Sequence, residues 1–109
     1  MRYAILCQEY YTMLVLRKIM AEVSGSAVFV GWADDRLSAI RLVASMRPSL
    51  VLAESELADG SPWAAGGEWT GIVIPIYESL ADRGACPGSL VKPVSAGDLK
   101  EIMFHLKLK

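Results

Sequence analysis

The chain has 109 residues, a length that corresponds to one domain and allows a buried core without disulfide or metal support. Hydrophobic residues make up 53% of the chain, which excludes an intrinsically disordered protein. The net charge is -1, so no strong electrostatic attraction to nucleic acid or to an anionic membrane is expected.

The first strand is predicted over residues 3–7 and the first helix over residues 9–23, where apolar side chains recur at helical spacing on one face and Gly25 follows. That face carries Met13, Leu16, Met20 and Val23. A second strand is predicted over residues 27–31, which are rich in β-branched and aromatic side chains. Asp34 or Asp35 can cap the next helix, whose predicted apolar face is Leu37, Ile40 and Ala44.

Three further apolar runs predict strands over residues 50–54, 71–77 and 90–91. Ser95 and Asp98 then resemble a capping box that opens the last helix. The predicted apolar face of this helix is Leu99, Ile102, Met103 and Leu106. The only histidine, His105, lies beside that face and is expected to point to solvent, so no metal-ligating cluster is predicted.

This alternation favours an α/β fold in three layers, with helices on both faces of a parallel sheet. We expect five strands in the flavodoxin-like, doubly wound order 2-1-3-4-5. Residues 58–69 leave room for only one or two helical turns, and residues 78–89 contain glycines and a proline that disfavour a full helix. The third and fourth helices are therefore expected to be shortened or missing, in a single domain over residues 1–109 with no effector domain.

Other sequence features bear on location. The longest apolar runs are well short of a membrane span, and the start lacks a signal-peptide pattern, so we expect a cytoplasmic protein that does not contact membranes. The two cysteines, Cys7 and Cys86, lack a C-x-x-C spacing, and both thiols are expected to be reduced.

Two charged residues come at predicted strand ends. The third strand ends on Glu54, and Lys92 follows the fifth strand, directly before Pro93. Because the carboxyl ends of parallel strands meet at one edge of the sheet, we expect Glu54 and Lys92 to face each other there.

This layout resembles the receiver domain of two-component response regulators over almost the whole chain. The resemblance places Glu54 where receivers carry the phosphoacceptor aspartate and Lys92 where they carry the lysine that contacts the phosphoryl group. It places Pro93 at a proline that is commonly cis in the family, and Tyr77 where receivers carry a switching threonine or serine. We expect Tyr77 to pack over the sheet edge instead of switching.

The two acids that hold magnesium in receivers fall on Cys7 and Gln8, and Glu9 matches the acid that often follows them. A thiol and an amide are poor replacements for carboxylates around magnesium, so no metal or other cofactor is expected. Cys7 is expected to be a small buried hydrophobe. The longer arm of Glu54 would misplace a phosphoryl group, which depends on positioning for its transfer.

Residues 57–63 are similar to an L-P-D-G-S-W run of some divergent receivers. Tryptophan is enriched in interface hot spots, so Trp63 is a candidate contact, although a buried position is equally open, while Trp69 is expected in the core. A missing fourth helix would leave apolar surface near Tyr77 and Val91 uncovered. We expect association through that edge and the last helix, including Met103.

The leading hypothesis is a degenerate receiver: a non-enzymatic interaction module of signal transduction that binds a protein without being phosphorylated. Its partner would be a histidine kinase, a downstream regulator or a second copy. The alternative is an active receiver in a phosphorelay, which accepts a phosphoryl group on Glu54 or a nearby serine. A small-ligand binder that uses the strand-end crevice ranks last, because the chain offers no phosphate-binding loop.

Overall fold

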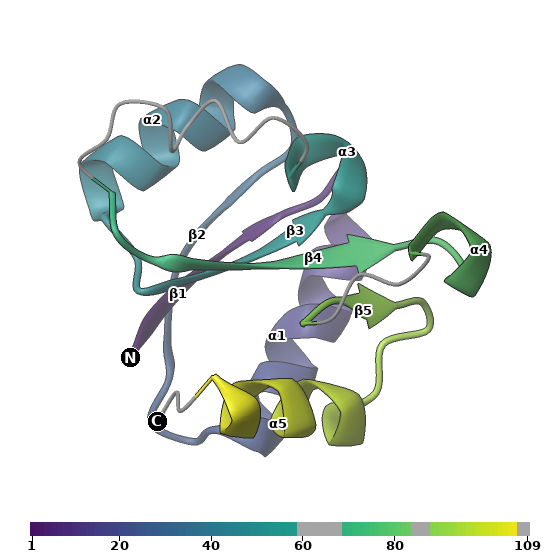
Figure 1. The fold of residues 1–109 in the computed structure, drawn as a ribbon. Coiled ribbons are helices and arrows are strands. Elements are labelled where there is room, and N and C mark those ends of the chain that lie inside the picture. Colours follow the sequence, from purple (N-terminus) through teal and green to yellow (C-terminus); the bar gives the residue numbers. More distant parts are fainter. Residues whose placement is uncertain (59–68, 84–87, 107–109) are drawn as a thin grey trace.

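The structure, a computed structural model, describes residues 1–58, 69–83 and 88–106 (Figure 1). In these residues five parallel strands form one sheet in the order β2-β1-β3-β4-β5, which confirms the predicted topology. The strands are β1 (Arg2–Leu6), β2 (Val28–Ala33), β3 (Leu50–Glu54), β4 (Ile72–Tyr77) and β5 (Leu90–Val91).

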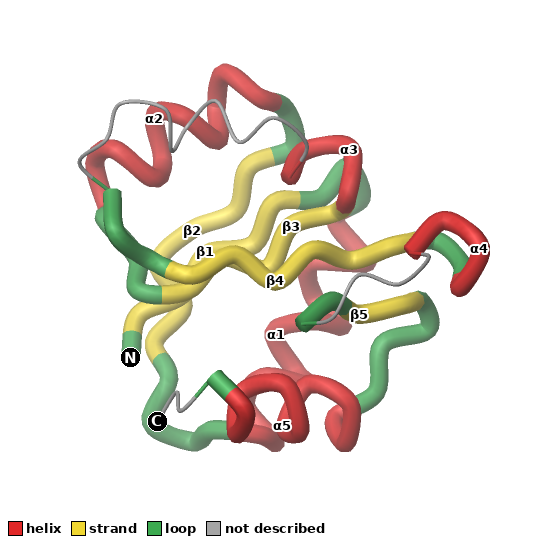
Figure 2. Tube along the Cα trace, viewed as in Figure 1, coloured by secondary structure: helices red, strands yellow, loops and turns green. Residues whose placement is uncertain are grey.

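Helices cover both faces of the sheet, as Figures 1 and 2 show. α1 (Tyr10–Val23) and α5 (Ala96–His105) lie together on one face, and α2 (Arg36–Met46) lies on the other. α3 (Ser55–Ala58) and α4 (Leu80–Arg83) have four residues each, so the predicted shortening is confirmed. α3 begins directly after β3, earlier than the segment in which we expected a helical turn.

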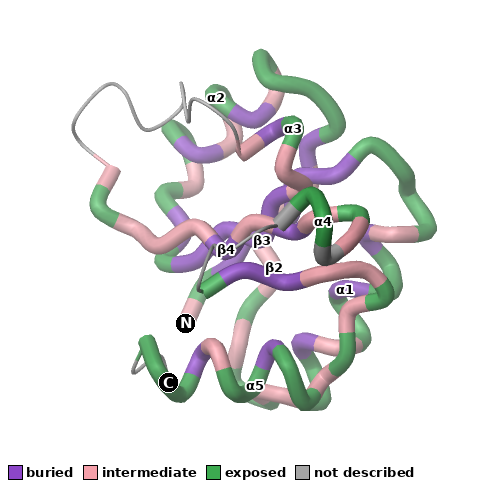
Figure 3. The backbone as a smooth tube through the Cα atoms, turned by 45° about the vertical axis from the view of Figure 1, so that its right-hand side comes forward, coloured by how far each residue is buried: buried purple, intermediate pink, exposed green. Residues whose placement is uncertain are grey.

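β1 and β3 are buried along most of their length, which explains their continuous apolar sequence (Figure 3). Side chains alternate between two hydrophobic clusters, one on each side of the sheet. Ile5, Leu52 and Ile74 stand in register across β1, β3 and β4, and all three are completely buried under α1 and α5. Ala4 and Val51 belong to the opposite cluster, which α2 covers.

The buried face of α2 differs from the predicted one. Leu37 and Ile40 are 57% and 37% exposed, and Ala44 is also exposed, whereas Ala39 and Val43 are buried. Both stripes have helical spacing, so periodicity alone did not distinguish them. The small side chain of Ala39 is completely buried against the sheet.

The helix starts follow the predicted capping. The Asp35 carboxylate accepts a hydrogen bond from the Ser38 backbone N–H (2.7 Å), and the Ser95 hydroxyl accepts one from the Asp98 N–H (3.1 Å). Both interactions satisfy N–H groups that a helix leaves unpaired in its first turn. The Lys92–Pro93 peptide bond is cis, as the resemblance implied.

Other boundaries and burial differ slightly from the predictions. α1 ends at Val23 with Ser24 as its C-cap, before Gly25, and β2 extends to Ala33 and therefore includes Trp32. Trp69 is half-buried against the cluster beneath α2, and its indole N–H donates to the Pro48 carbonyl (2.7 Å). None of the helices in the described ranges is long and apolar enough to span a membrane.

Candidate functional site

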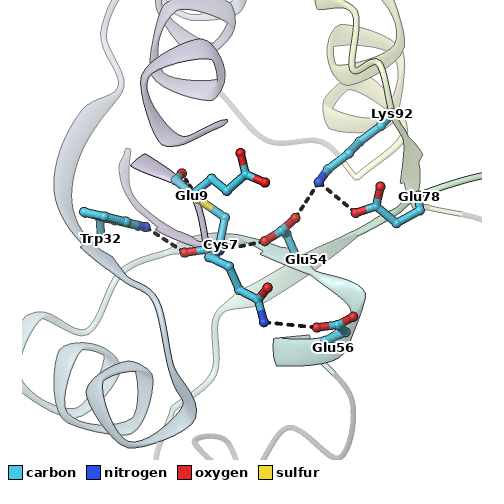
Figure 4. Close-up of polar contacts among 8 residues, drawn as sticks. Cys7, Glu9, Trp32, Glu54, Glu56, Glu78 and Lys92 are labelled. Atoms are coloured by element: carbon cyan, nitrogen blue, oxygen red, sulfur yellow. Dashed lines mark hydrogen bonds and ion pairs between the residues drawn. The ribbon is translucent and has the colours of Figure 1, made fainter. Parts of the chain in front are cut away.

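The candidate site lies where the carboxyl ends of the strands meet. Glu54 ends β3, Cys7 follows β1, Glu78 follows β4 and Lys92 follows β5. Figure 4 shows that Glu54 and Glu78 both point toward the Lys92 ammonium. The parallel topology therefore brings together groups that are up to 85 positions apart in the chain, counted from Cys7 to Lys92 (92 - 7 = 85).

Both oxygens of the Glu54 carboxylate are engaged. Oε2 lies 2.5 Å from Lys92 Nζ, and Oε1 accepts a hydrogen bond from the Gln8 backbone N–H (2.7 Å). The Glu54 side chain is only 14% exposed, so these contacts replace most of its hydration. The predicted meeting of Glu54 and Lys92 is confirmed.

Lys92 is shared between two acids. Its ammonium also contacts Glu78 Oε1 at 2.9 Å, although the Glu78 side chain is 68% exposed. Burial alone would lower the pKa of Lys92, but hydrogen bonds and charge from Glu54 and Glu78 outweigh burial and raise its pKa above the ordinary lysine value. The lysine is therefore held in its charged form across the physiological pH range.

Cys7 is completely buried, as predicted. Its thiol donates to the Glu9 carbonyl (3.3 Å), and its own carbonyl accepts from the Trp32 indole N–H (2.9 Å). Burial, and next the negative charge of Glu54, raise the pKa of the Cys7 thiol to about 11. The thiol is therefore protonated at neutral pH.

The Gln8 side chain turns toward α3, where its amide donates to Glu56 Oε2 (3.1 Å). Glu9 is exposed and stands at the N-cap of α1, where its side chain makes no capping hydrogen bond. In the described part of the chain, no group of three or more histidine, cysteine or acidic side chains is arranged to hold a metal ion.

Sequence reasoning missed three residues of this site: Trp32, Glu56 and Glu78. Glu78 could have been found, because it directly follows a predicted strand and strand ends meet at this edge. The contact of Trp32 depends on where β2 ends and that of Glu56 on where α3 begins, and hydrophobic periodicity fixes neither boundary.

The predicted interaction residues differ in how far they are buried. Met103 is 4% exposed and lies in the core between α1, α5 and the sheet, so its prediction as a contact residue was wrong. It occupies the buried stripe of α5 together with Leu99. Tyr77 and Val91 are half-buried, and Val91 lines an open hollow of about 340 Å³ beside α5. Trp63 lies outside the described residues.

Known proteins match this chain in structure but not in sequence. No protein-family model and no curated protein matches the sequence. Solved structures do match: the anti-anti-sigma factor PhyR from Bartonella quintana is 20% identical, with a TM-score of 0.75, over 97% of this chain and 48% of that chain. The chain therefore spans about half the length of that PhyR.

Two isolated receiver domains match over nearly their whole length. The receiver domain of PhyR from Erythrobacter litoralis is 25% identical, with a TM-score of 0.74, over 99% of this chain and 91% of that chain. The receiver domain of the putative response regulator NarL from Mycobacterium tuberculosis is 18% identical, with a TM-score of 0.72, over 96% and 94%. The chain has the receiver fold. The sequence resemblance places the phosphoacceptor at the end of the third strand and its lysine after the fifth. Glu54 and Lys92 occupy these two strand ends in the structure.

Proposed function

We propose that this chain is a degenerate receiver, a cytoplasmic signalling module that binds a protein partner without being phosphorylated and without enzymatic activity. The observation that carries the proposal is the engagement of both Glu54 oxygens, by Lys92 and by the Gln8 backbone. Because the Glu54 carboxylate already neutralises Lys92, the lysine is not available to bind an incoming phosphoryl group.

The reach of Glu54 supports this proposal. Its side chain is one methylene longer than aspartate and spans the distance to Lys92 directly, so a negative charge is fixed beside the lysine at all times. A receiver of this kind holds one permanent charge state at its site. Its output would then be set by the abundance of its partner and not by a kinase.

Magnesium does not fit the donor set of the site. The positions of the usual acid pair carry a buried, protonated thiol and an amide that is hydrogen-bonded to Glu56. Magnesium prefers several hard oxygen ligands in octahedral geometry, and phosphoryl transfer relies on such an ion to neutralise charge. This mismatch supports a site that works without metal and without other cofactors.

An active receiver is the alternative, because Glu54 and Lys92 do lie together at the strand ends. The two functions are separated by NMR with ¹⁵N-labelled protein, titrated with magnesium and then with magnesium and beryllofluoride, a phosphoryl mimic. We expect the amides of Gln8, Glu54 and Lys92 to stay unshifted at millimolar magnesium. Saturable shifts confined to these residues would establish the active receiver instead.

Partner binding is tested with the signalling proteins encoded beside this chain in its genome. A histidine kinase or regulator that binds should do so with equal affinity in calorimetry with and without acetyl phosphate. Affinity that depends on the phosphodonor would contradict the proposal.

A further inference from the structure

The outer face of α1 is apolar where a surface helix is usually polar. The inner face buries Met13, Leu16 and Met20 against the sheet. On the outer side, Tyr10 and Tyr11 are 59% and 73% exposed, and Leu14 and Val15 are 40% and 37% exposed. Among the described residues, four of the nine exposed large hydrophobic side chains therefore lie within the first two turns of one helix. We call this set, Tyr10, Tyr11, Leu14 and Val15, the α1 patch.

Two cations follow the α1 patch along the helix. Arg17 and Lys18 are both exposed, and no acidic residue occurs between Tyr10 and Ala21. The order of side chains has a symmetry centred on Leu14: Tyr11 and Arg17 lie three residues on either side of it, and Tyr10 and Lys18 lie four residues on either side. Residues three and four apart share a helix face, so this set belongs to one surface.

This symmetry makes the face complementary to itself. In an antiparallel pair of α1 helices that cross at Leu14 about a two-fold axis, the tyrosines of each copy meet the cations of the other. A cation over a tyrosine ring is a favourable contact. At 1.5 Å of rise per residue, the two Lys18 Cα atoms would be about 12 Å apart along the helix axis, and the two Arg17 Cα atoms about 9 Å apart. Both separations exceed the Debye length of about 8 Å, so repulsion between these exposed cations is reduced by screening.

Neighbouring rings already hold two of these side chains in place. The Arg17 guanidinium lies 4.3 Å above the Phe29 ring, and the Tyr10 ring meets the Trp32 ring edge-on, with 5.5 Å between centroids. Side chains that are ordered before association lose less conformational entropy when they bind. The face is therefore preorganised at its cationic end and at its aromatic end.

Two hollows lie beside the exposed face of α1, one on each side. One of about 370 Å³ is lined by Tyr11 and Val15 together with Pro93 and Val94 after β5. The other, of about 440 Å³, is lined by Leu14, Arg17 and Lys18 together with Phe29, Tyr3 and neighbouring residues of α1 and the α1–β2 turn. A second helix that crosses α1 can place its ridge of side chains into such grooves.

We propose that a second copy of this chain covers the α1 patch, in an isologous dimer whose α1 helices cross antiparallel at Leu14. The inference goes beyond the proposed function and does not depend on it, because none of the four residues of the α1 patch takes part in the Glu54–Lys92 contacts, although Lys92 also lines the hollow beside Tyr11 and Val15.

The first test measures the oligomeric state by sedimentation equilibrium across protein concentrations. Wild type should show a reversible monomer–dimer equilibrium, and Leu14→Lys should weaken dimerisation by about tenfold or more, since it adds two positive charges at the centre of an interface that already holds Arg17 and Lys18 of both copies. Phe104→Lys is the matched control, because Phe104 is 78% exposed on α5, outside the α1 patch. Circular dichroism should show that both variants remain folded.

A monomer at every concentration would overturn the proposal. A dimer that Phe104→Lys breaks and Leu14→Lys leaves intact would overturn it as well, and would place the interface at α5. Because Leu14 is already exposed, its substitution leaves no cavity that could unfold the protein.

The second test uses the two-fold axis itself. A residue on the axis meets its own copy, so Leu14→Cys in a Cys86→Ser background should form an intermolecular disulfide under mild oxidation. The native Cys7 is buried and protonated and does not compete. Phe104→Cys in the same background should stay monomeric on a non-reducing gel. Equal cross-linking of the two variants would contradict an interface centred on Leu14.

Discussion

Glu54 binds two partners at once because its arm is long enough to reach both. One oxygen meets Lys92 and the other meets the Gln8 backbone, so the acid connects the ends of β1, β3 and β5. Lys92 is 27% exposed and also contacts Glu78, which means that solvent and a second acid reduce the strength of the main pair. The ion pair is therefore expected to be of moderate strength.

A double-mutant cycle measures this pair. Glu54→Gln and Lys92→Met, studied by urea denaturation, should show a coupling free energy of about 1 kcal/mol, at the upper end for exposed pairs because Glu54 is mostly buried. The same cycle with Glu78→Gln is the control and should give less, because Glu78 is 68% exposed. Effects of Glu54→Gln and Lys92→Met that add within error would mean that the two charges do not interact in solution.

The Cys7 thiol should be chemically inert in the folded protein. Its pKa is raised to about 11 by burial, and next by the charge of Glu54, so thiolate is scarce at pH 8. Since this folded-state pKa lies above that of a free thiol, Cys7 stabilises the fold below about pH 8.5, and that contribution is lost as the pH rises through 11.

The measurement is the rate of reaction with Ellman's reagent in a Cys86→Ser variant. At pH 8 we expect Cys7 to react at least 100-fold more slowly in the native protein than in urea, because the folded protein forms about 100-fold less thiolate for a pKa difference of about two units. Fast native reaction at pH 8 would show that the thiol is accessible and ionised.

At the scale of single elements, the strands were the most predictable part of the fold. β1 and β3 are buried on both faces, so their sequences are apolar without interruption, and the order of such runs with helices between them specifies a parallel sheet. The Glu54–Lys92 contact followed from the same rule, since strand ends meet at one edge. Fold and central ion pair were thus both accessible from sequence.

The predictions failed where two apolar stripes share the same helical spacing, or where packing determines which apolar residues are buried. α2 has two apolar stripes at helical spacing, and the stripe of Ala39 and Val43 is buried instead of the one with Leu37 and Ile40. The position of Met103 on the last helix predicts a contact residue, but an apolar residue on that stripe packs into the core. Such choices depend on the shape of the facing sheet surface, which a single sequence does not display.

The junction before β4 depends on one glycine. A Cβ at Gly71 would clash with the Trp69 ring and would lie 2.8 Å from the Pro48 carbonyl oxygen, which accepts the Trp69 indole N–H. Gly71→Ala should therefore destabilise the protein by about 1–3 kcal/mol, the range for overpacking. Thermal and urea unfolding provide the measurement.

Gly25→Ala is the matched control, because nothing lies within 4 Å of a Cβ at that position. We expect a change of less than about 0.5 kcal/mol, as for most surface substitutions. If both substitutions cost the same, the close packing of Trp69 over Gly71 would be contradicted.

At the scale of the whole molecule, the receiver fold is retained while its parts diverge. The sheet order and the packing of α1 and α5 are intact, whereas α3 and α4 are reduced to four residues each. At the strand ends, Lys92 is paired with a glutamate, Glu54. Together with the apolar outer face of α1, these features fit the proposed role of a module that acts through its surfaces.

The central claim is that the site does not accept a phosphoryl group, and intact-protein mass spectrometry tests it most directly. The chain is incubated with acetyl phosphate and magnesium, beside an active receiver as a positive control. We predict an unchanged mass, because Glu54 is held by Lys92 and Gln8 and because Cys7 and Gln8 stand where the sequence resemblance places the two metal-binding acids. A stoichiometric gain of one phosphoryl group that Glu54→Gln abolishes would contradict the account and establish a working phosphoacceptor.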